Sequence, residues 1–333
     1  MGRLTRREFL GSAATAAGAL ACGLHRSPDQ TPRWPESRPL RCVFYTDVHA
    51  RPDGDTPRAL ALAASAINDR NPDLVLAGGD LIADGFEVSS AATAPQWDAY
   101  MEMHRAIRAK VHPVLGNHDL VAAAPSDGTV PSADPRDVFR RRLGLERTYY
   151  AFDSGGYRFF VLDSVHLLGE GDPYEGRISE EQIGWIRQEL AGLAKETPLV
   201  LATHIPLRTA FYQATQGATV PAPRDRVVVN SKEVLDLFAD HRLILVLQGH
   251  LHVNEALVWG GTTFITGGAI SGRWWRNLAR DEGRVRRRHP RRRPGGLGVR
   301  RLRLARRIVG SRRTIHSPPG STLTPPPARR RVE

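Results

Sequence analysis

Five short apolar runs, each ending in a polar cluster, constrain this 333-residue chain more than any other feature. Runs of this length and composition are typical of buried β-strands. The clusters that follow them are Asp47-x-His49, Gly79-Asp80, Gly116-Asn117-His118-Asp119, Thr203-His204 and Gly249-His250-x-His252. Open α/β sheets bind ligands beyond the carboxyl ends of their strands. The sequence therefore predicts that these distant residues meet at one edge of a sheet.

Helical and hairpin patterns separate the apolar runs. Leu60, Ala64 and Ile67 share one face of a helix predicted over 57–69, with Pro57 in its first turn. Glycine pairs at 155–156 and 260–261 divide strand-like runs in the manner of hairpins. The other predicted elements are helices 97–110, 179–194 and 231–239 and strands 42–45, 74–77, 111–115, 148–152, 157–163, 199–202, 243–247, 255–259 and 262–266. The order βαβαβ, followed by hairpins and αβ units, predicts an α/β fold with two packed sheets.

The polar clusters have the chemistry of a metal site. Imidazole, carboxylate and amide oxygen suit Mn, Fe, Zn or Ni better than a metal that prefers thiolate. Cys22 and Cys42 are the two cysteines of the chain, too few for a cysteine-rich zinc site. Each cluster alone is more often a polar turn than a ligand. Five of them in this order, each after a strand-like run, favour a metal centre.

These blocks resemble the calcineurin-like metallophosphoesterase family, whose pattern is D-x-H, G-D, G-N-H-D/E, H and G-H-x-H. The resemblance covers roughly residues 40–275 and includes every block, so we place the catalytic domain at 39–275. It implies a four-layer α/β/β/α sandwich of two mixed sheets flanked by helices. It also implies a metal-dependent phosphoric ester hydrolase.

The resemblance assigns a role to each block. A first metal ion would be bound by Asp47, His49 and His252, and a second by Asn117, His204 and His250. Asp80 would bridge the two ions. His118 would not be a ligand but would stabilise or protonate the leaving oxygen, with Asp119 as its orienter.

Charge counting supports this arrangement. Two divalent ions bring four positive charges, and Asp47, Asp80 and a bridging hydroxide bring three negative ones. The net positive charge attracts a phosphate ester, and the hydroxide can attack phosphorus without a protein nucleophile. The resemblance is strongest to the branch that includes cyclic-nucleotide phosphodiesterases, which favours a phosphodiester. A phosphomonoesterase on the same site and a non-catalytic metal-binding scaffold of the same fold are the alternatives.

Two positions depart from related proteins. Purple acid phosphatases have Tyr three residues after the bridging Asp, where this chain has Ala83. Their redox-tuned iron site is therefore not expected. Many relatives have an acidic residue at that same position, helping the catalytic His. Here Asp84 stands four residues after Asp80, which leaves its role open.

The first 25 residues resemble a twin-arginine export signal. Residues 5–10 are Thr-Arg-Arg-Glu-Phe-Leu, and an Ala/Gly-rich stretch too short for a membrane span follows. This predicts the export machinery as a partner and a location in the periplasm or at the cell surface. Residues 20–23 allow either lipidation of Cys22 or ordinary cleavage nearby. Residues 26–38, with several prolines and charges, are predicted to be a linker.

The basic character of the chain lies almost entirely in its last 58 residues. The formal charge is +12, but residues 276–333 contain 19 Arg and 3 acidic residues, and the rest of the chain has a net charge of −4. We therefore predict a disordered Arg/Pro-rich tail over 276–333 rather than a nucleic-acid-binding body. One hypothesis makes this tail an out-of-frame reading of a GC-rich gene. The other makes it a genuine basic segment that binds anionic lipid or nucleic acid.

Overall fold

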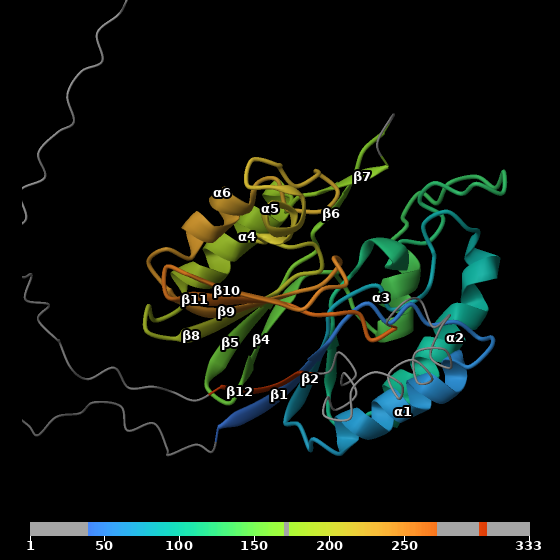
Figure 1. Ribbon diagram of the computed structural model, residues 1–333, viewed down its shortest axis with the longest axis horizontal. Helices are drawn as coiled ribbons and strands as arrows, with labels where there is room; N and C mark the ends of the chain where they lie inside the picture. The colour runs from blue at the N-terminus through green and yellow to red at the C-terminus, as the bar shows by residue number, and fades with distance from the viewer. Residues whose placement is uncertain (1–38, 170–172, 272–299, 305–333) are drawn as a thin grey trace, which may run out of the picture. The chain divides into compact units, whose positions relative to one another are not determined.

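The computed structural model describes residues 39–169, 173–271 and 300–304, which form two β-sheets with helices against them (Figure 1). The proposed export signal and linker, over 1–38, lie outside the described residues. Within the described part of the chain, no helix combines the length and apolar character that crossing a membrane requires.

The smaller sheet bears the first three polar clusters. Its strands lie in the order β12-β1-β2-β3, and β1, β2 and β3 run parallel. Their bounds are β1 (Leu40–Tyr45), β2 (Leu74–Ala77), β3 (Val111–Pro113) and β12 (Arg300–Leu304). Because the three strands are parallel, the segments after Tyr45, Ala77 and Pro113 leave the sheet at one edge.

The larger sheet bears the last two clusters. Its strand order is β10-β11-β9-β8-β5-β4, with β4 and β10 antiparallel to their neighbours. The bounds are β4 (Tyr150–Ser154), β5 (Tyr157–Val161), β8 (Pro198–Ala202), β9 (Arg242–Gln248), β10 (Glu255–Trp259) and β11 (Thr262–Thr266). The two sheets meet at their carboxyl edges, where the Ile270 amide donates to the Thr46 carbonyl at 3.0 Å.

Alternate residues of each strand face different partners. In β1, Cys42 and Phe44 join the apolar cluster that also contains Phe159, Val200 and Leu245 of the larger sheet. The residues between them, such as Val43, belong to a second cluster with the buried faces of the helices. This period-two alternation gives each sheet one face toward the other sheet and one toward helices. The predicted four-layer α/β sandwich is therefore confirmed.

The helices lie on the outer faces of the sheets (Figure 1). Their bounds are α1 (Thr56–Asn68), α2 (Ser90–Ala106), α3 (Asp137–Leu143), α4 (Glu180–Ala191), α5 (Phe211–Gln216) and α6 (Ser231–Leu237). Figure 1 shows α1 and α2 beside the smaller sheet and α4 and α6 beside the larger one. Ser179 caps α4, where its hydroxyl accepts a hydrogen bond from the Gln182 amide.

Most predicted elements are present, but several short ones were missed. Helix α2 begins at Ser90 rather than Trp97 and contains Pro95. Sequence patterns did not predict α3, α5 or the two-stranded sheet of β6 (Val165–Leu167) and β7 (Tyr174–Gly176). The buried residue of α3 is Phe139, which contacts Trp97 edge to face at 6.2 Å between ring centroids. A helix with so short an apolar face gives little periodic signal.

Strand β12 lies inside the segment predicted to be disordered. It pairs antiparallel with β1, from Leu40↔Leu304 to Phe44↔Arg300. The backbone groups of an edge strand are a ready template for another strand, which accounts for the pairing. In sequence, Arg and Leu alternate over 301–304, the period expected of a strand. The expectation of disorder is therefore corrected for 300–304. The rest of 276–333 lies outside the described residues, and its origin stays a prediction.

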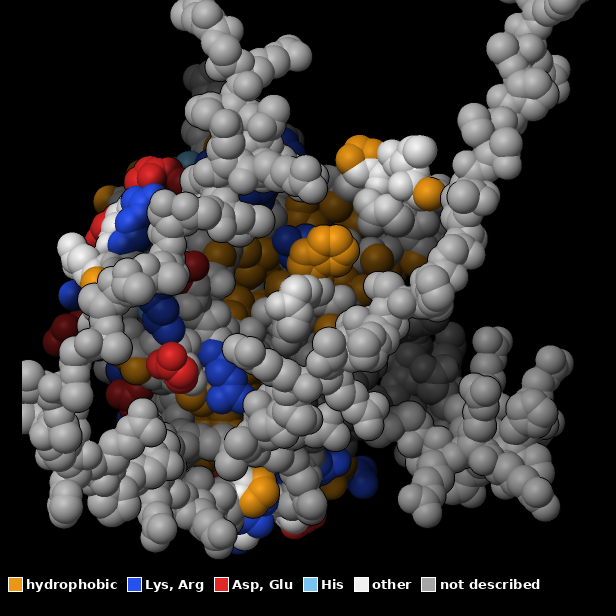
Figure 2. Space-filling view, turned by 90° about the vertical axis from the view of Figure 1, so that its left-hand side faces the viewer, with side chains coloured by type: hydrophobic (Ala, Val, Ile, Leu, Met, Phe, Trp, Pro, Cys, Tyr) orange, Lys and Arg blue, Asp and Glu red, His pale blue; other side chains and the backbone are white. Residues whose placement is uncertain are grey.

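One end of the larger sheet exposes apolar side chains. Val258 and Trp259 of β10 are 73% and 67% exposed. The Arg208 guanidinium lies 5.6 Å from the centroid of the Trp259 ring. Figure 2 views the molecule from this side and shows hydrophobic side chains gathered on its surface. This surface belongs to the hairpin β10–β11 and lies apart from the polar clusters at the strand ends.

Candidate metal centre

The polar clusters occupy strained turns at the ends of the strands. Positive φ is uncommon for residues other than glycine and costs about 1–3 kcal/mol, so its clustering indicates a functional site. Five of the predicted ligands have it: Asp47 (56°), His49 (47°), Asp80 (52°), His250 (70°) and His252 (54°). Hydrogen bonds hold two of these turns together, since the Asp47 amide donates to Gly79 O and the His49 amide to Asp80 O, both at 2.9 Å.

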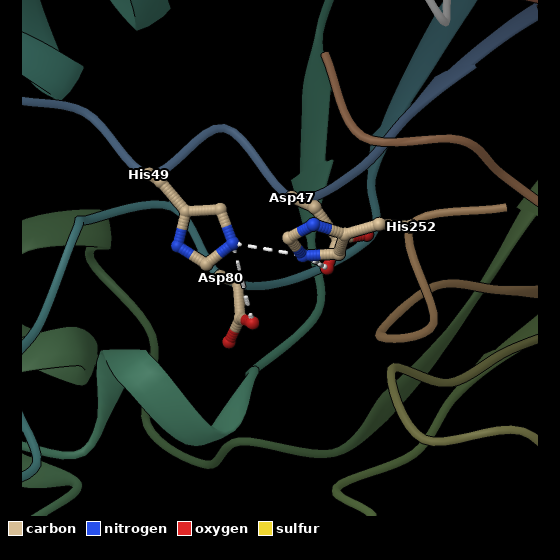
Figure 3. Close-up of side chains that lie close together, drawn as sticks. All are labelled: Asp47, His49, Asp80 and His252. Carbon is tan, nitrogen blue, oxygen red and sulfur yellow. Dashed lines mark hydrogen bonds and ion pairs between the residues drawn. The ribbon is translucent and has the colours of Figure 1, made fainter. Parts of the chain in front are cut away.

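Four side chains form a first group of possible metal ligands, Asp47, His49, Asp80 and His252. His252 Nε2 lies 3.1 Å from Asp47 Oδ1 and 3.1 Å from His49 Nε2. His49 Nε2 lies 3.7 Å from Asp80 Oδ2. Figure 3 shows the two imidazoles pointing toward one another and toward the two carboxylates. One ligand atom from each residue falls within 4.8 Å of the others, close enough to surround one cation.

A second group shares Asp80 with the first and adds His204 and His250. His204 Nε2 lies 3.2 Å from Asp80 Oδ2 and 3.2 Å from His250 Nδ1. Both imidazoles come from the larger sheet, after β8 and β9, whereas Asp80 follows β2 of the smaller sheet. One carboxylate therefore stands between two groups of ligands, the arrangement expected of a bridge between two ions.

Asn117 provides an independent test of whether a metal fits the second group. Its side chain is buried, and its Oδ1 has no hydrogen-bond partner among the described residues. An unsatisfied buried amide oxygen costs about 1–3 kcal/mol. A cation would satisfy that oxygen. The next residue is tied to the bridging carboxylate, because the His118 amide donates to Asp80 Oδ1 at 2.9 Å.

Backbone carbonyls select which imidazole nitrogen faces the centre. His204 Nδ1 lies 2.8 Å from the Gly78 carbonyl, and His250 Nε2 lies 2.9 Å from the Asp225 carbonyl. A carbonyl oxygen accepts only, so these nitrogens carry the protons. When both rings are neutral, Nε2 of His204 and Nδ1 of His250 have lone pairs available for a cation, as metal-binding histidines require.

Burial and neighbouring charges shift the pKa values of the side chains in the two groups. Burial raises the pKa of Asp80, but His204, His118 and His49 outweigh it and hold that pKa well below its usual value. Burial lowers the pKa of His204, but the Asp80 charge and hydrogen bond raise it to about 9. Burial and the charge of His204 lower the pKa of His250 to about 3. The carboxylate thus remains ionised and draws positive charge to the place where the ligands converge.

Glycine is required beside the bridging carboxylate. A Cβ at Gly116 would collide with the backbone nitrogen and Oδ1 of Asp80. A Cβ at Gly79, which has φ of 94°, would lie 2.5 Å from His204 Nδ1. The clusters can pack this closely because the residues before the ligands have no side chain.

His118 stands beside the shared carboxylate, and Asp84 stands beside His118. The structure places His118 Nδ1 3.9 Å from Asp84 Oδ1. Burial lowers the pKa of His118, but the negative charges of Asp80 and Asp84 raise it above its usual value. The turn after Asp80 thus brings the Asp84 carboxylate, four residues later in the chain, near His118, and its role in catalysis stays open.

The hydrogen bonds of Asp119 run to the backbone. Its Oδ1 accepts from the Leu81 amide at 2.7 Å, and its Oδ2 accepts from the Gly116 amide at 2.9 Å. The side chain is fully buried and ties the segment after β2 to the segment after β3. These bonds give it a part in holding the two turns together. Its role as the orienter of His118 stays a prediction.

Three contributors to the centre escaped the sequence patterns. The Thr46 hydroxyl donates to Asp47 Oδ2 at 2.7 Å, and the carbonyls of Gly78 and Asp225 hold the histidines. Gly78 and Thr46 adjoin predicted ligands, so their positions could have suggested a role. Asp225 lies 25 residues before His250, and a backbone carbonyl has no residue signature.

Comparison with known proteins identifies the family of the chain. The family model described as calcineurin-like phosphoesterase matches residues 40–254. A protein of Synechococcus sp. described as a probable cyclic nucleotide phosphodiesterase is 26% identical over 259 residues, which are 78% of this chain and 82% of that protein. A protein of Rhodococcus erythropolis with the same description is 26% identical over 228 residues, 66% of this chain and 64% of that protein.

Two solved structures share the fold. A dimetal phosphatase from Danio rerio superposes with a TM-score of 0.53 at 17% identity, covering 69% of this chain and 88% of that one. A phosphopantetheinyl hydrolase from Mycobacterium tuberculosis gives a TM-score of 0.50 at 16% identity, covering 80% and 96%. At these identities the likeness concerns the fold of the chain.

Proposed function

The chain belongs to the calcineurin-like phosphoesterase family and is a phosphoric ester hydrolase, and we propose that it hydrolyses a phosphodiester at a centre for two divalent metal ions. Two ions are supported by the position of Asp80, which belongs to both groups of possible metal ligands. Its carboxylate belongs both to the group with Asp47, His49 and His252 and to the group with His204 and His250. Asn117, whose buried Oδ1 has no hydrogen-bond partner among the described residues, would complete the second group.

Each ligand set has a separate task in this proposal. Asp47, His49, His252 and Asp80 would hold the first ion, and Asp80, Asn117, His204 and His250 the second. When bound, a pair of divalent ions supplies Lewis acidity, lowers the pKa of water and neutralises the phosphoryl oxygens. Mn, Fe, Zn and Ni all suit this donor set.

His118 is the residue placed to move a proton. Its own amide donates to Asp80 Oδ1, and its Nδ1 lies 3.9 Å from Asp84 Oδ1, which would help to orient the ring. Nε2 is then the nitrogen left to donate to the leaving oxygen. General acid catalysis of this kind contributes about 10²–10⁴-fold to a rate.

The preference for a diester is supported by the two curated relatives, both described as probable cyclic nucleotide phosphodiesterases. The metal ligands serve diesters and monoesters alike. Specificity is expected in the loops over 120–136 and 167–178. The choice between phosphodiester and phosphomonoester is therefore a question for assay.

The test uses metal-free protein reconstituted with Mn²⁺ and two substrates, bis-p-nitrophenyl phosphate and p-nitrophenyl phosphate. We expect two ions per chain and a higher kcat/KM for the diester. Asp80→Ala should lose both ions and turnover. His118→Ala should keep both ions and lose about 10²–10⁴-fold in rate. Full activity in Asp80→Ala would overturn the bridging assignment.

The same assay separates the alternatives. A higher kcat/KM for p-nitrophenyl phosphate would make the protein a phosphomonoesterase. Binding of two ions without turnover of either substrate would favour a non-catalytic scaffold. The full set of ligands and His118 at the strand ends favours the enzyme.

Export is a second part of the proposal and rests on the sequence of the first 25 residues. The twin-arginine route carries folded proteins, so metal could be loaded before transport. Replacement of Arg6 and Arg7 by Lys should keep a tagged protein in the cytoplasm. Metabolic labelling with a palmitate analogue, compared with Cys22→Ser, decides between lipid anchoring and ordinary cleavage.

A further inference from the structure

His250 depends on a loop for its orientation, in contrast to the ligands held by strand ends alone. Its Nε2 lies 2.9 Å from the carbonyl oxygen of Asp225. Asp225 lies in an irregular segment between α5 and α6. The same segment includes Arg224 and continues to Val229. We call residues 224–229 the strap.

The strap is joined to β7 along its backbone. The Gly176 amide donates to the Arg224 carbonyl at 2.9 Å, and the Val229 amide donates to the Gly176 carbonyl at 2.8 Å. Gly176 and Val228 also form an isolated parallel bridge. A Cβ at Gly176 would collide with the Val227 carbonyl, so the close approach requires glycine.

A buried carboxylate reinforces this junction. Glu175 of β7 is 2% exposed. Its Oε1 accepts a hydrogen bond from Arg177 Nε at 2.6 Å, and its Oε2 accepts one from Arg224 Nη2. Arg224 is therefore fixed to β7 at both ends, through its carbonyl and through its guanidinium. Arg177 stays bonded to Glu175 when Arg224 is replaced, so the buried carboxylate keeps one cationic partner.

The Asp225 carbonyl lies one residue beyond this anchor and within the strap. Because it accepts the Nε2 proton of His250, it directs Nδ1 toward His204 Nε2, 3.2 Å away. We propose that Glu175 and Arg224 are positioning residues, which act through the Asp225 carbonyl to orient His250 as a ligand of the second metal ion. The proposal rests on the two-metal centre of the proposed function.

Loss of a group that orients a metal ligand typically lowers metal affinity about 10–100-fold. Arg224→Ala should therefore lower the affinity for the second ion by about that factor and leave the affinity for the first ion unchanged. Arg224→Lys keeps the charge and should restore most of the affinity. Glu175→Gln keeps an acceptor and should fall between the two.

The experiment titrates the metal-free full chain with Co²⁺ and follows binding by calorimetry and by visible absorption. The variants are Arg224→Ala, Arg224→Lys and Glu175→Gln. Arg158→Ala is the matched control, because Arg158 of β5 also pairs with acidic side chains, Asp153 of β4 and Glu189 of α4, away from the strap. A thermal melt of each metal-free variant reports whether the fold is retained.

The expected result is a selective loss of the weaker Co²⁺ step in Arg224→Ala, with both steps unchanged in Arg158→Ala. In a His250→Ala background, Arg224→Ala should have no further effect on metal binding. Unchanged binding of both ions in Arg224→Ala would overturn the inference, as would an equal weakening of both steps that Arg224→Lys fails to restore. If the wild-type chain binds only one ion, the two-metal function itself fails.

Discussion

The two groups of ligands share one carboxylate but differ in what supports them. In the first group, Asp47 and His49 lie in turns bonded directly to the segment after β2. In the second group, the His204 ring is hydrogen-bonded to the Gly78 carbonyl at the end of β2. The His250 ring is instead hydrogen-bonded to the Asp225 carbonyl of the strap. Strand ends are fixed by the sheet, but an irregular segment needs its own anchors. We therefore expect the first ion to bind more tightly than the second.

The largest effect should follow from Gly116→Ala, which removes the difference between the groups. Its Cβ would collide with Asp80, the residue that both groups share. Both metal ions should be lost, and turnover should fall by more than about 10³-fold, as expected when a metal that lowers the pKa of water is absent. Metal analysis and the diester assay measure this.

Gly184→Ala is the control for that substitution. A Cβ at Gly184, within α4, meets nothing within 4 Å. This change should keep both ions and alter the free energy of unfolding by less than about 1 kcal/mol in the stabilising direction. Retention of both ions in Gly116→Ala would show that Asp80 does not need its present position.

Asp47→Ala and Asn117→Ala should have smaller effects on metal binding, and the two substitutions should affect the two ions differently. The Asp47 carboxylate contacts His252 and also accepts from the His250 amide at 3.2 Å, so it touches both groups. In the proposed arrangement, Asn117 would supply its Oδ1 to the second ion alone. We expect Asp47→Ala to lose the first ion and weaken the second, and Asn117→Ala to weaken only the second. Co²⁺ titration resolves the two steps, and equal effects of both substitutions would contradict the comparison.

The smallest effect should be a pH dependence of the stability that Glu175 contributes through its bonds to the strap. Burial raises the pKa of Glu175, but its bonds with Arg177 and Arg224 outweigh this and hold the pKa below its usual value. Its contribution to stability is therefore complete above the unfolded-state pKa of about 4.3 and is lost as the pH falls through the lower folded-state pKa.

Denaturation of the metal-free protein between pH 7 and pH 3 measures this contribution. The difference in unfolding free energy between wild type and Glu175→Gln should stay constant down to about pH 5 and shrink below it. A difference that already shrinks between pH 7 and pH 6 would mean that another group governs the strap. Comparing wild type with Glu175→Gln therefore isolates the part of the stability that depends on the Glu175 carboxylate bonded to the strap.

Local patterns were sufficient for the long elements and for the chemistry of the centre. The strand over 74–77 and the hairpin of 255–259 and 262–266 have the predicted bounds, because turn residues such as glycine mark where these runs end. The predicted ligands follow strands in five places, and the structure brings six of them into the two groups, namely Asp47, His49, Asp80, His204, His250 and His252. Asn117 adjoins Asp80 through the backbone of the next residue.

The tertiary structure alone decided the partners that have no sequence signature. Asp84 reaches His118 because the turn after Asp80 folds back, and Asp119 instead binds the backbone of Leu81 and Gly116. Strand β12 pairs with β1 from a region whose composition predicted disorder. The residue types at the strand ends thus determined the kind of centre, because donor chemistry belongs to side chains. Its orientation was decided by backbone groups such as the Asp225 carbonyl, which every residue possesses and only folding can place.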